Sequence, residues 1–159
     1  FAKVMELMGA QVTYLSISLE VTGKNVAAGE RLNAFDLDFN LIPDAAMTAA
    51  ALAGYADGPC TLRNIASWRV KETDRIEAMQ NELRKVGAQF ESGPDWLRVH
   101  PIEKGQWRSA EIHTYDDHRI AMCMSLMAFG GQSQTILDPQ CVSKTFPTYF
   151  DVFEHLIKG

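Results

Sequence analysis

The sequence predicts an α/β fold in which helices cover a β-sheet. Segments with apolar residues three and four positions apart, as in a helix that packs on a core, alternate with short strand-like segments. This alternation is typical of proteins in which helices pack on a sheet. The predicted strand at 111–115 keeps polar residues in alternation, so the sequence leaves open whether the sheet is wholly parallel and buried on both faces.

Helix patterns occur along the whole chain. Residues 1–8 form the first amphipathic segment. The second helix begins at Pro43, because proline suits the first helical position, and it extends to about residue 54. The third, at 72–86, carries apolar residues on one face. Two further helices are predicted at 117–129 and 145–157.

Strands are predicted between these helices. Residues 11–21 alternate like a pair of strands. Residues 88–99 predict a hairpin that turns at 92–95, where Ser, Gly, Pro and Asp favour a turn. Single strands are expected at 34–39, 61–65, 111–115 and 135–137.

The same order of elements is predicted twice. The segment ELMGAQV at 6–12 returns as RKVGAQF at 84–90, an offset of roughly 75 residues, which is too long for a solenoid repeat. We therefore expect one partial domain over residues 1–159. It would contain one repeat unit at about 1–86, with its start missing, and a second at about 87–159.

The composition favours a folded, cytoplasmic protein that binds neither nucleic acid nor membranes. Of its 159 residues 47% are hydrophobic, and its formal net charge is −5. The sequence has no basic stripe, and its longest apolar run is too short for a membrane span. Cys60, Cys123 and Cys141 are far apart, which is typical of reduced thiols. The sequence has no phosphate-binding loop, so nucleotide binding has no support, and its histidines lack metal-ligand spacing, so we expect no metal.

Charged residues gather at four predicted helix starts. Cations are mildly unfavourable there, because the exposed N–H groups of a helix N-terminus carry partial positive charge. A small anion bound between helix and cations would account for them. Since the repeat places these groups at equivalent points, we expect them to converge: Asp44, Lys71, Glu72, Arg75, His118, Arg119 and Lys144.

The first two of these groups also have ordinary structural interpretations. Asp44 could complement the dipole of its helix, or it could accept a proton from a bound hydroxyl. Glu72 and Arg75 have the spacing of a surface ion pair. Arg69 and Lys71 add positive charge around Arg75, so a positive pocket accounts better for the whole group.

The other two groups can be interpreted in the same two ways. Arg119 could pair with the preceding Asp116 and Asp117, although the apolar helix after it restricts its access to solvent. A lone lysine such as Lys144 is usually solvated. Its position argues for function, because it recurs where Lys71 falls in the other repeat.

Four motifs follow one another along the chain: IPDAAMT at 42–48, RNI at 63–65 followed by WRVKETDR at 68–75, YDDHRIAM at 115–122 and KTFP at 144–147. In this order they resemble the motifs of the EPSP synthase family. Each alone is weak, whereas all of them in order are specific. The related UDP-N-acetylglucosamine carboxyvinyltransferase family shares the fold, but it lacks the KETDR segment and uses a reactive cysteine that has no counterpart here.

The resemblance implies an inside-out α/β protein of two similar domains built from βαβαββ units, with this chain as its C-terminal part. The family transfers the enolpyruvyl group of phosphoenolpyruvate to the 5-hydroxyl of shikimate 3-phosphate and releases phosphate, without a cofactor. The missing N-terminal part would complete the site, so we expect the chain alone to be inactive. A folded anion-binding fragment without catalysis is the alternative.

The resemblance also implies roles for individual residues. Asp44 would accept a proton and contact the shikimate 5-hydroxyl, and Glu72 would be the second proton-transfer group. Ser67 and Lys71 would bind shikimate 3-phosphate, although the family often has Asn at the position of Ser67. The residues expected to bind phosphoenolpyruvate are Arg75, His118, Arg119 and Lys144.

Overall fold

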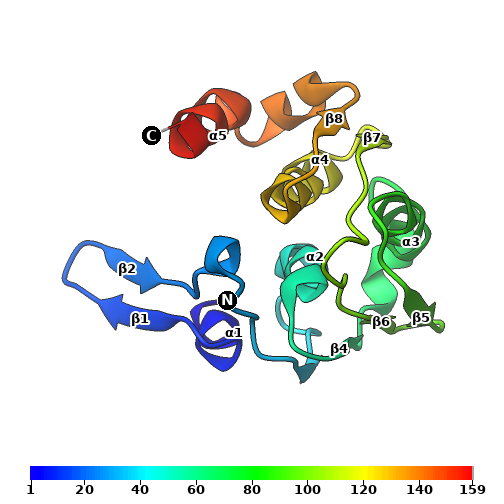
Figure 1. Ribbon diagram of the computed structural model, residues 1–159. Coiled ribbons are helices and arrows are strands. Elements are labelled where there is room, and N and C mark those ends of the chain that lie inside the picture. The colour runs from blue at the N-terminus through cyan, green and yellow to red at the C-terminus, as the bar shows by residue number, and fades with distance from the viewer. Residues whose placement is uncertain (159) are drawn as a thin grey trace.

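Helices and strands alternate along the chain in the computed structural model, which describes residues 1–158 (Figure 1). The strands are β1 (Gln11–Tyr14), β2 (Leu19–Thr22), β3 (Asp36–Asp38), β4 (Cys60–Arg63), β5 (Phe90–Ser92), β6 (Leu97–Val99), β7 (Ala110–Ile112) and β8 (Gln134–Ile136). The α-helices are α1 (Ala2–Leu7), α2 (Pro43–Leu52), α3 (Arg75–Lys85), α4 (His118–Ser125) and α5 (Tyr149–Lys158). The predicted α/β class is confirmed.

The largest sheet is mixed, in the order β3-β4-β6-β5. β3 runs parallel to β4, with Asp36 opposite Thr61, whereas β6 is antiparallel to both β4 and β5. The strands β1 and β2 form an antiparallel hairpin, and β7 pairs in parallel with β8. The sheets of the described residues are therefore not wholly parallel, a question that the sequence left open. The antiparallel pairings lie at β6 and in the β1–β2 hairpin, whereas β7, at the predicted strand 111–115, is paired in parallel.

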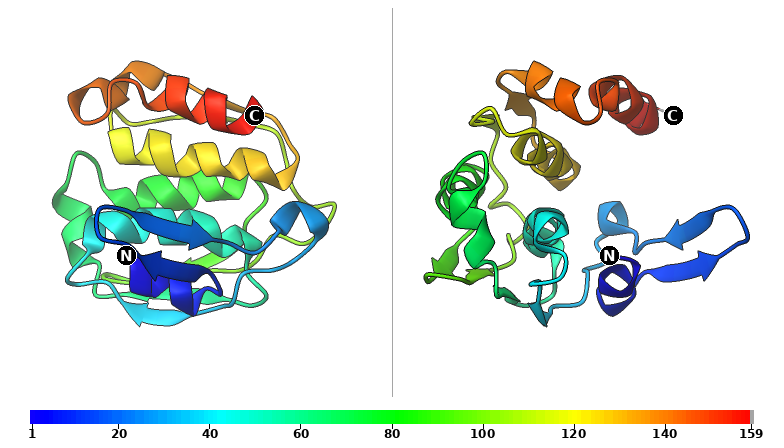
Figure 2. Two further views of the ribbon diagram at one scale, coloured as in Figure 1. Left: turned by 90° about the vertical axis from the view of Figure 1, so that its left-hand side faces the viewer. Right: turned by 180° about the vertical axis from the view of Figure 1, so that it is seen from behind.

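Helices α2, α3 and α4 lie roughly parallel and pack beside one another (Figure 2). The interior face of α2 is built from alanines and Met47, which have no exposed surface. The small alanine side chains let neighbouring elements approach closely. Trp68 is fully buried and donates from Nε1 to the Pro43 carbonyl at 2.7 Å, which ties the 3-10 helix Ala66–Val70 to the start of α2.

The order helix, hairpin, strand, helix, strand extends from α1 to β4 and returns from α3 to β8. This order of elements is the one predicted from the amino-acid sequence. The division into two repeat units near residue 86 remains a prediction.

Two predicted helix starts are wrong by several residues. The helix expected from residue 72 begins at Arg75, because Asp74 caps it by accepting the N–H groups of Ile76 and Glu77. Lys71 and Glu72 therefore belong to the preceding turn. The helix expected from residue 145 begins at Tyr149, since a residue that precedes proline, here Phe146, disfavours helical geometry.

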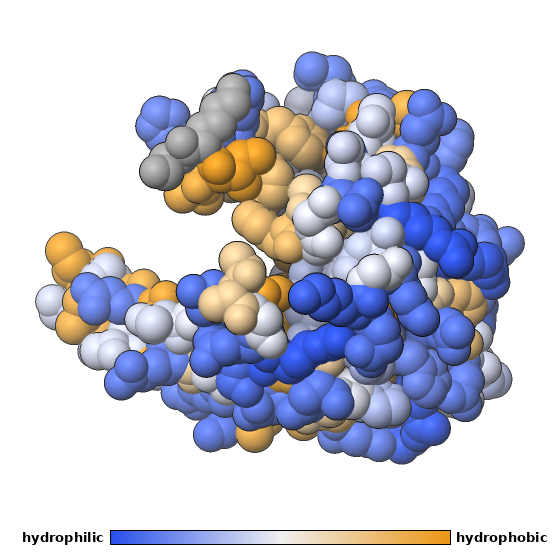
Figure 3. Space-filling model, viewed as in Figure 1, coloured by the Kyte–Doolittle hydropathy of each residue, from blue (hydrophilic) through white to orange (hydrophobic). Residues whose placement is uncertain are grey.

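Apolar side chains are exposed on the hairpin and on α5, which project on either side of a recess (Figures 1 and 3). Ile17 at the tip of the hairpin is 97% exposed, and Leu156 on α5 is 75% exposed. Apolar surface of this extent usually marks a contact face. Within residues 1–158, no helix is long and apolar enough to cross a membrane.

Candidate active site

Arg75 connects the N-terminal ends of three helices. It is the first residue of α3, and only 1% of its side chain is exposed. Its Nη1 donates to Asp44, in the first turn of α2, at 2.9 Å, and its Nε donates to Asp117, the N-cap of α4, at 2.7 Å. Its Nη2 donates to Glu72 at 2.9 Å. Three groups that are distant in sequence therefore lie together.

Asp44 is surrounded by cations. Besides Arg75, its carboxylate oxygens lie 3.2 Å from Nη2 of Arg119 and 3.6 Å from Nζ of Lys71. Partial burial acts to raise the pKa of Asp44, but the nearby Arg119, Arg75 and Lys71 outweigh it, so the pKa lies below its usual value. The carboxylate is ionised at neutral pH, as a proton acceptor must be.

Glu72 connects Arg75 to Lys144, whose Nζ lies 3.0 Å from Glu72 Oε1. A hydrogen bond from its own backbone N–H and the contact with Lys144 lower the pKa of Glu72 to about 2. Lys144 is the last residue of the 3-10 helix Pro139–Lys144, so it does not start a helix as predicted. It nevertheless reaches the same cluster.

The start of α4 contributes His118 and Arg119. His118 is buried, and its Nδ1 has no hydrogen-bond partner among the described residues. Burial lowers the pKa of His118, so the ring is neutral at neutral pH. The Arg119 side chain pairs with Asp44 on α2, while Asp117 accepts the backbone N–H of Arg119 at 2.9 Å. The alternative ion pair of Arg119 with its neighbouring aspartates is therefore wrong.

Two residues of the 3-10 helix Ala66–Val70, Ser67 and Arg69, form no hydrogen bond or ion pair with the charged cluster in the described chain. Arg69 donates to Asp74 at 2.7 Å and to the carbonyls of Gly93 and Pro94, so it stabilises the β5–β6 turn and adds no charge to the pocket. Ser67 is half-buried beside Trp68 and makes no side-chain hydrogen bond to another described residue. Its predicted contact with a phosphate remains a prediction.

The cluster is less positive than the sequence suggested. Its cations are balanced almost completely by carboxylates of the chain, because Asp117 joins Asp44 and Glu72. With His118 neutral, one net positive charge remains from the four cations Lys71, Arg75, Arg119 and Lys144. Three of these cations are partly exposed, whereas Arg75 is enclosed.

Comparison with known proteins identifies the family. The sequence profile of EPSP synthase (3-phosphoshikimate 1-carboxyvinyltransferase) matches residues 1–153. The chain belongs to the EPSP synthase family. It is 64% identical over 159 residues to the 3-phosphoshikimate 1-carboxyvinyltransferase of Bordetella petrii and 62% identical to that of Bordetella avium. Each alignment covers 100% of this chain and 36% of the relative, so the chain spans about a third of their length.

Solved structures of this family and of a related enzyme have the same fold as the chain. A 2.37 Å structure of EPSP synthase from Acinetobacter baumannii superposes with a TM-score of 0.77 at 24% identity, covering 97% of this chain and 38% of that one. The enolpyruvyl transferase NikO from Streptomyces tendae gives a TM-score of 0.69 at 19% identity, over 99% of this chain and 34% of that one. The predicted enolpyruvyl transferase fold is therefore confirmed.

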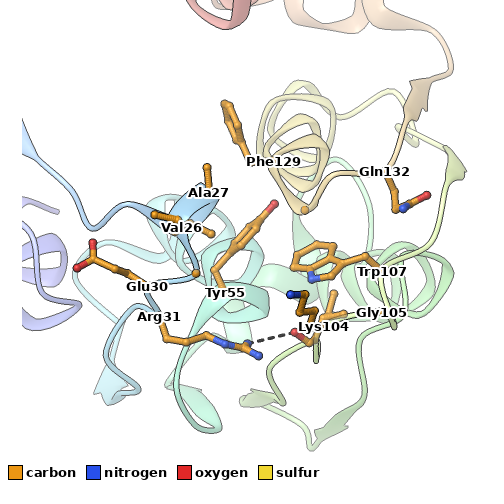
Figure 4. Close-up of a pocket in the computed structure, with 14 residues that line it drawn as sticks. Val26, Ala27, Glu30, Arg31, Tyr55, Lys104, Gly105, Trp107, Phe129 and Gln132 are labelled. Carbon is orange, nitrogen blue, oxygen red and sulfur yellow. Dashed lines mark hydrogen bonds between the residues drawn. The ribbon is translucent and has the colours of Figure 1, made fainter.

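A cavity of about 550 Å³ lies elsewhere in the chain. Figure 4 shows Tyr55 and Trp107 in its wall, and their rings stack with centroids 4.6 Å apart. Arg31 closes another side by donating to the Ile102 carbonyl at 3.1 Å. None of the predicted site residues lines this cavity. The charged cluster is the better candidate site, because reactive groups converge there and not at the cavity.

One residue of the cluster was missed as a site residue. From the sequence, Asp117 was expected only as a possible partner of Arg119, whereas in the structure it has no exposed surface and lies against Arg75. An aspartate directly before an apolar helix does predict an N-cap. The pairing of Asp117 with Arg75 on α3, however, has no signal in the sequence. No group of metal-ligating side chains occurs in the part of the chain described.

Proposed function

We propose that this chain supplies part of the active site of a cytoplasmic 3-phosphoshikimate 1-carboxyvinyltransferase. The reaction transfers the enolpyruvyl group of phosphoenolpyruvate to the 5-hydroxyl of shikimate 3-phosphate and releases phosphate. The observation that carries the proposal is the convergence of two ionised carboxylates, Asp44 and Glu72, with cations from three separate segments. The chain length implies that the rest of the enzyme completes the site.

In this proposal Asp44 accepts the proton of the 5-hydroxyl as that oxygen bonds to the enol carbon of phosphoenolpyruvate. Glu72 is the candidate for proton transfer at the methylene carbon, which gains a proton on addition and loses one when phosphate leaves. Its low pKa reflects the hydrogen bond from its own backbone N–H and then the contact with Lys144. Sharing that lysine with an incoming phosphate would raise the pKa of Glu72 and make it a better proton carrier.

Phosphoenolpyruvate would bind against Arg119 and Lys144. Their ion pairs with Asp44 and Glu72 are partly exposed, and such pairs contribute at most about 1 kcal/mol, so an incoming anion can replace them. Arg75 has no exposed nitrogen to offer until Asp44 or Glu72 turns away. Its contact with phosphoenolpyruvate is therefore proposed only for a rearranged, ligand-bound site.

The remaining predicted contacts belong to the same proposal. Lys71 is about one-third exposed beside Asp44, which suits a contact with the phosphate of shikimate 3-phosphate. Ser67 would use its hydroxyl for the same phosphate. His118 would line the phosphoenolpyruvate half of the pocket, where its unpaired Nδ1 can accept a hydrogen bond.

A mechanism based on a cysteine nucleophile has no support in the residues described. Cys60, Cys123 and Cys141 are all buried. Burial raises the pKa of Cys60 to about 11 and also raises the pKa of the other two thiols. Protonated, enclosed thiols are poor nucleophiles. This argues against the cysteine-dependent carboxyvinyltransferase as the alternative function.

The proposal is tested by phosphate release from phosphoenolpyruvate and shikimate 3-phosphate. The complete enzyme should release phosphate, and the isolated chain should not, because closure of both halves excludes water and completes the site. Turnover by the isolated chain would contradict the half-site interpretation. A complete enzyme without turnover would contradict the proposed reaction.

The second candidate function is anion binding without catalysis by the chain alone, which its coverage of about a third of each relative favours. Phosphoenolpyruvate titrated into the isolated chain should then shift the NMR signals of Arg119 and Lys144. The variant Lys104→Met, which alters a cation at the separate cavity, should show the same shifts. Absence of shifts would exclude a retained half-site.

A further inference from the structure

Glu82 is a fully buried carboxylate that the reaction above does not use. It lies on α3, seven residues after Arg75, so both side chains are on the same face of the helix, two turns apart. Glu82 Oε2 accepts a hydrogen bond from the Lys85 ammonium at 2.6 Å and another from the backbone N–H of His113 at 3.1 Å. Glu82 Oε1 accepts the Tyr115 hydroxyl at 2.8 Å.

The segment that Glu82 holds has an unusual backbone. Tyr115 and Asp116 both have positive φ, 55° and 54°. This left-handed geometry costs roughly 1–2 kcal/mol per non-glycine residue, so it persists only where the surroundings enforce it. The turn ends at Asp117, whose N–H donates to the Thr114 carbonyl at 2.8 Å. It therefore sets where α4 begins.

Two polar contacts from one face of α3 thus enclose this turn. Arg75 holds its C-terminal end through the Asp117 side chain, and Glu82 holds its other end through the His113 backbone and the Tyr115 hydroxyl. Lys85 adds a hydrogen bond to the Glu111 carbonyl in β7 at 3.0 Å. A shift of the turn would move the residues that follow it.

We infer that Glu82 is a positioning residue for the start of α4: it keeps the turn at 113–116 in its left-handed form, so that Arg119 faces Asp44. This inference rests on the proposed function for its kinetic consequence. Because Arg119 is proposed to bind phosphoenolpyruvate, its displacement should weaken that binding. A misplacement of about 1 Å can cost about 100-fold, which gives the scale expected. Glu82 itself touches no reacting group.

The test compares variants of the complete enzyme. Glu82→Ala removes both hydrogen bonds to the turn and should raise KM for phosphoenolpyruvate about 10- to 100-fold. Glu82→Gln should restore it to within about threefold, because the amide oxygen can accept from His113 while the NH₂ group donates to the Tyr115 hydroxyl oxygen. Leu83→Ala, a cavity variant of the same helix, controls for lost stability alone and should leave KM unchanged.

A crystal structure of Glu82→Ala gives a second readout that does not depend on turnover. Tyr115 and Asp116 should leave the left-handed region, and the distance from Arg119 to Asp44 should increase beyond its present 3.2 Å. An unchanged turn would overturn the inference, as would a KM for Leu83→Ala that rises as far as that of Glu82→Ala. If the unaltered complete enzyme showed no turnover, only the proposed reaction would be overturned, because the crystal structure of Glu82→Ala would still test the inference.

Discussion

Arg75 and Asp117 form an ion pair that is closed to solvent. Nε of Arg75 lies 2.7 Å from Oδ2 of Asp117, and the side chains are 1% and 0% exposed. Burying two charges costs several kcal/mol per ion unless each is well paired, and here both guanidinium edges and both carboxylate oxygens are engaged. The pair fixes α3 against α4 at the point where the candidate site begins.

Removing the negative charge of this pair should destabilise the fold. Asp117→Asn leaves the buried Arg75 with only Asp44 and Glu72, so the free energy of unfolding should fall by about 3 kcal/mol. Urea denaturation measures this. The matched control Asp116→Asn changes an exposed aspartate at a backbone angle that asparagine tolerates, and it should change stability by less than about 0.5 kcal/mol. Equal effects would contradict the importance of the pair.

The contribution of Glu72 to stability should depend on acid pH. Its pKa is lowered in the fold from 4.5 to about 2, so the ionised form is bound more tightly by the folded state. The stabilisation is complete above pH 4.5 and is lost as pH falls toward 2. The difference in urea midpoint between the unaltered chain and Glu72→Gln should therefore shrink below pH 4.5. For Glu20→Gln, on the exposed hairpin, a similar trend would contradict this assignment.

Lys144 should matter for phosphoenolpyruvate affinity. Replacing it removes a charged hydrogen bond to the bound anion, an effect of about 1.5–3 kcal/mol, so Lys144→Met in the complete enzyme should raise KM for phosphoenolpyruvate about 10- to 100-fold. Lys104→Met, at the separate cavity, should leave this KM unchanged. If both lysines gave the same result, the cluster would not be the phosphoenolpyruvate site.

Asp44 should affect turnover more than binding. An amide has the same shape but cannot take up the hydroxyl proton, so Asp44→Asn should lower kcat about 100- to 10,000-fold. Phosphate release under saturating substrates measures kcat. Asp38→Asn alters a more exposed carboxylate that pairs with Asn64 at the sheet edge, and kcat should be preserved. Retained turnover in Asp44→Asn would exclude Asp44 as the proton acceptor.

The sequence predicted most of the fold because its signals are local. Apolar spacing and turn residues located each α-helix and strand of the described chain to within a few residues, but not 3-10 helices such as Val26–Ala28 and Pro139–Lys144. Pro43 marked the start of α2 as expected. The start of α3 was misplaced because a charged run, 71–75, was treated as a helical turn although Asp74 provides a better N-cap. Four ordered motifs sufficed to indicate the family.

The pairings within the cluster could not be predicted in the same way. From spacing alone, Arg119 had neighbouring aspartates to pair with, yet its guanidinium lies against Asp44, 75 positions away along the chain. Glu82 carries no motif, and its partners come from a turn about 30 residues later. Such choices depend on which groups share a buried environment, where an unpaired charge is costly.

The sequence by itself determined the α/β class, the order of elements and the motifs that carry the reactive side chains, because periodicity, caps and turn residues act over a few positions. The tertiary structure decided which charges meet. Packing α2, α3 and α4 side by side brings their N-terminal ends together at Arg75 and encloses that guanidinium among carboxylates. Desolvation then requires each enclosed charge to have a partner, and only the three-dimensional arrangement of the helices supplies one.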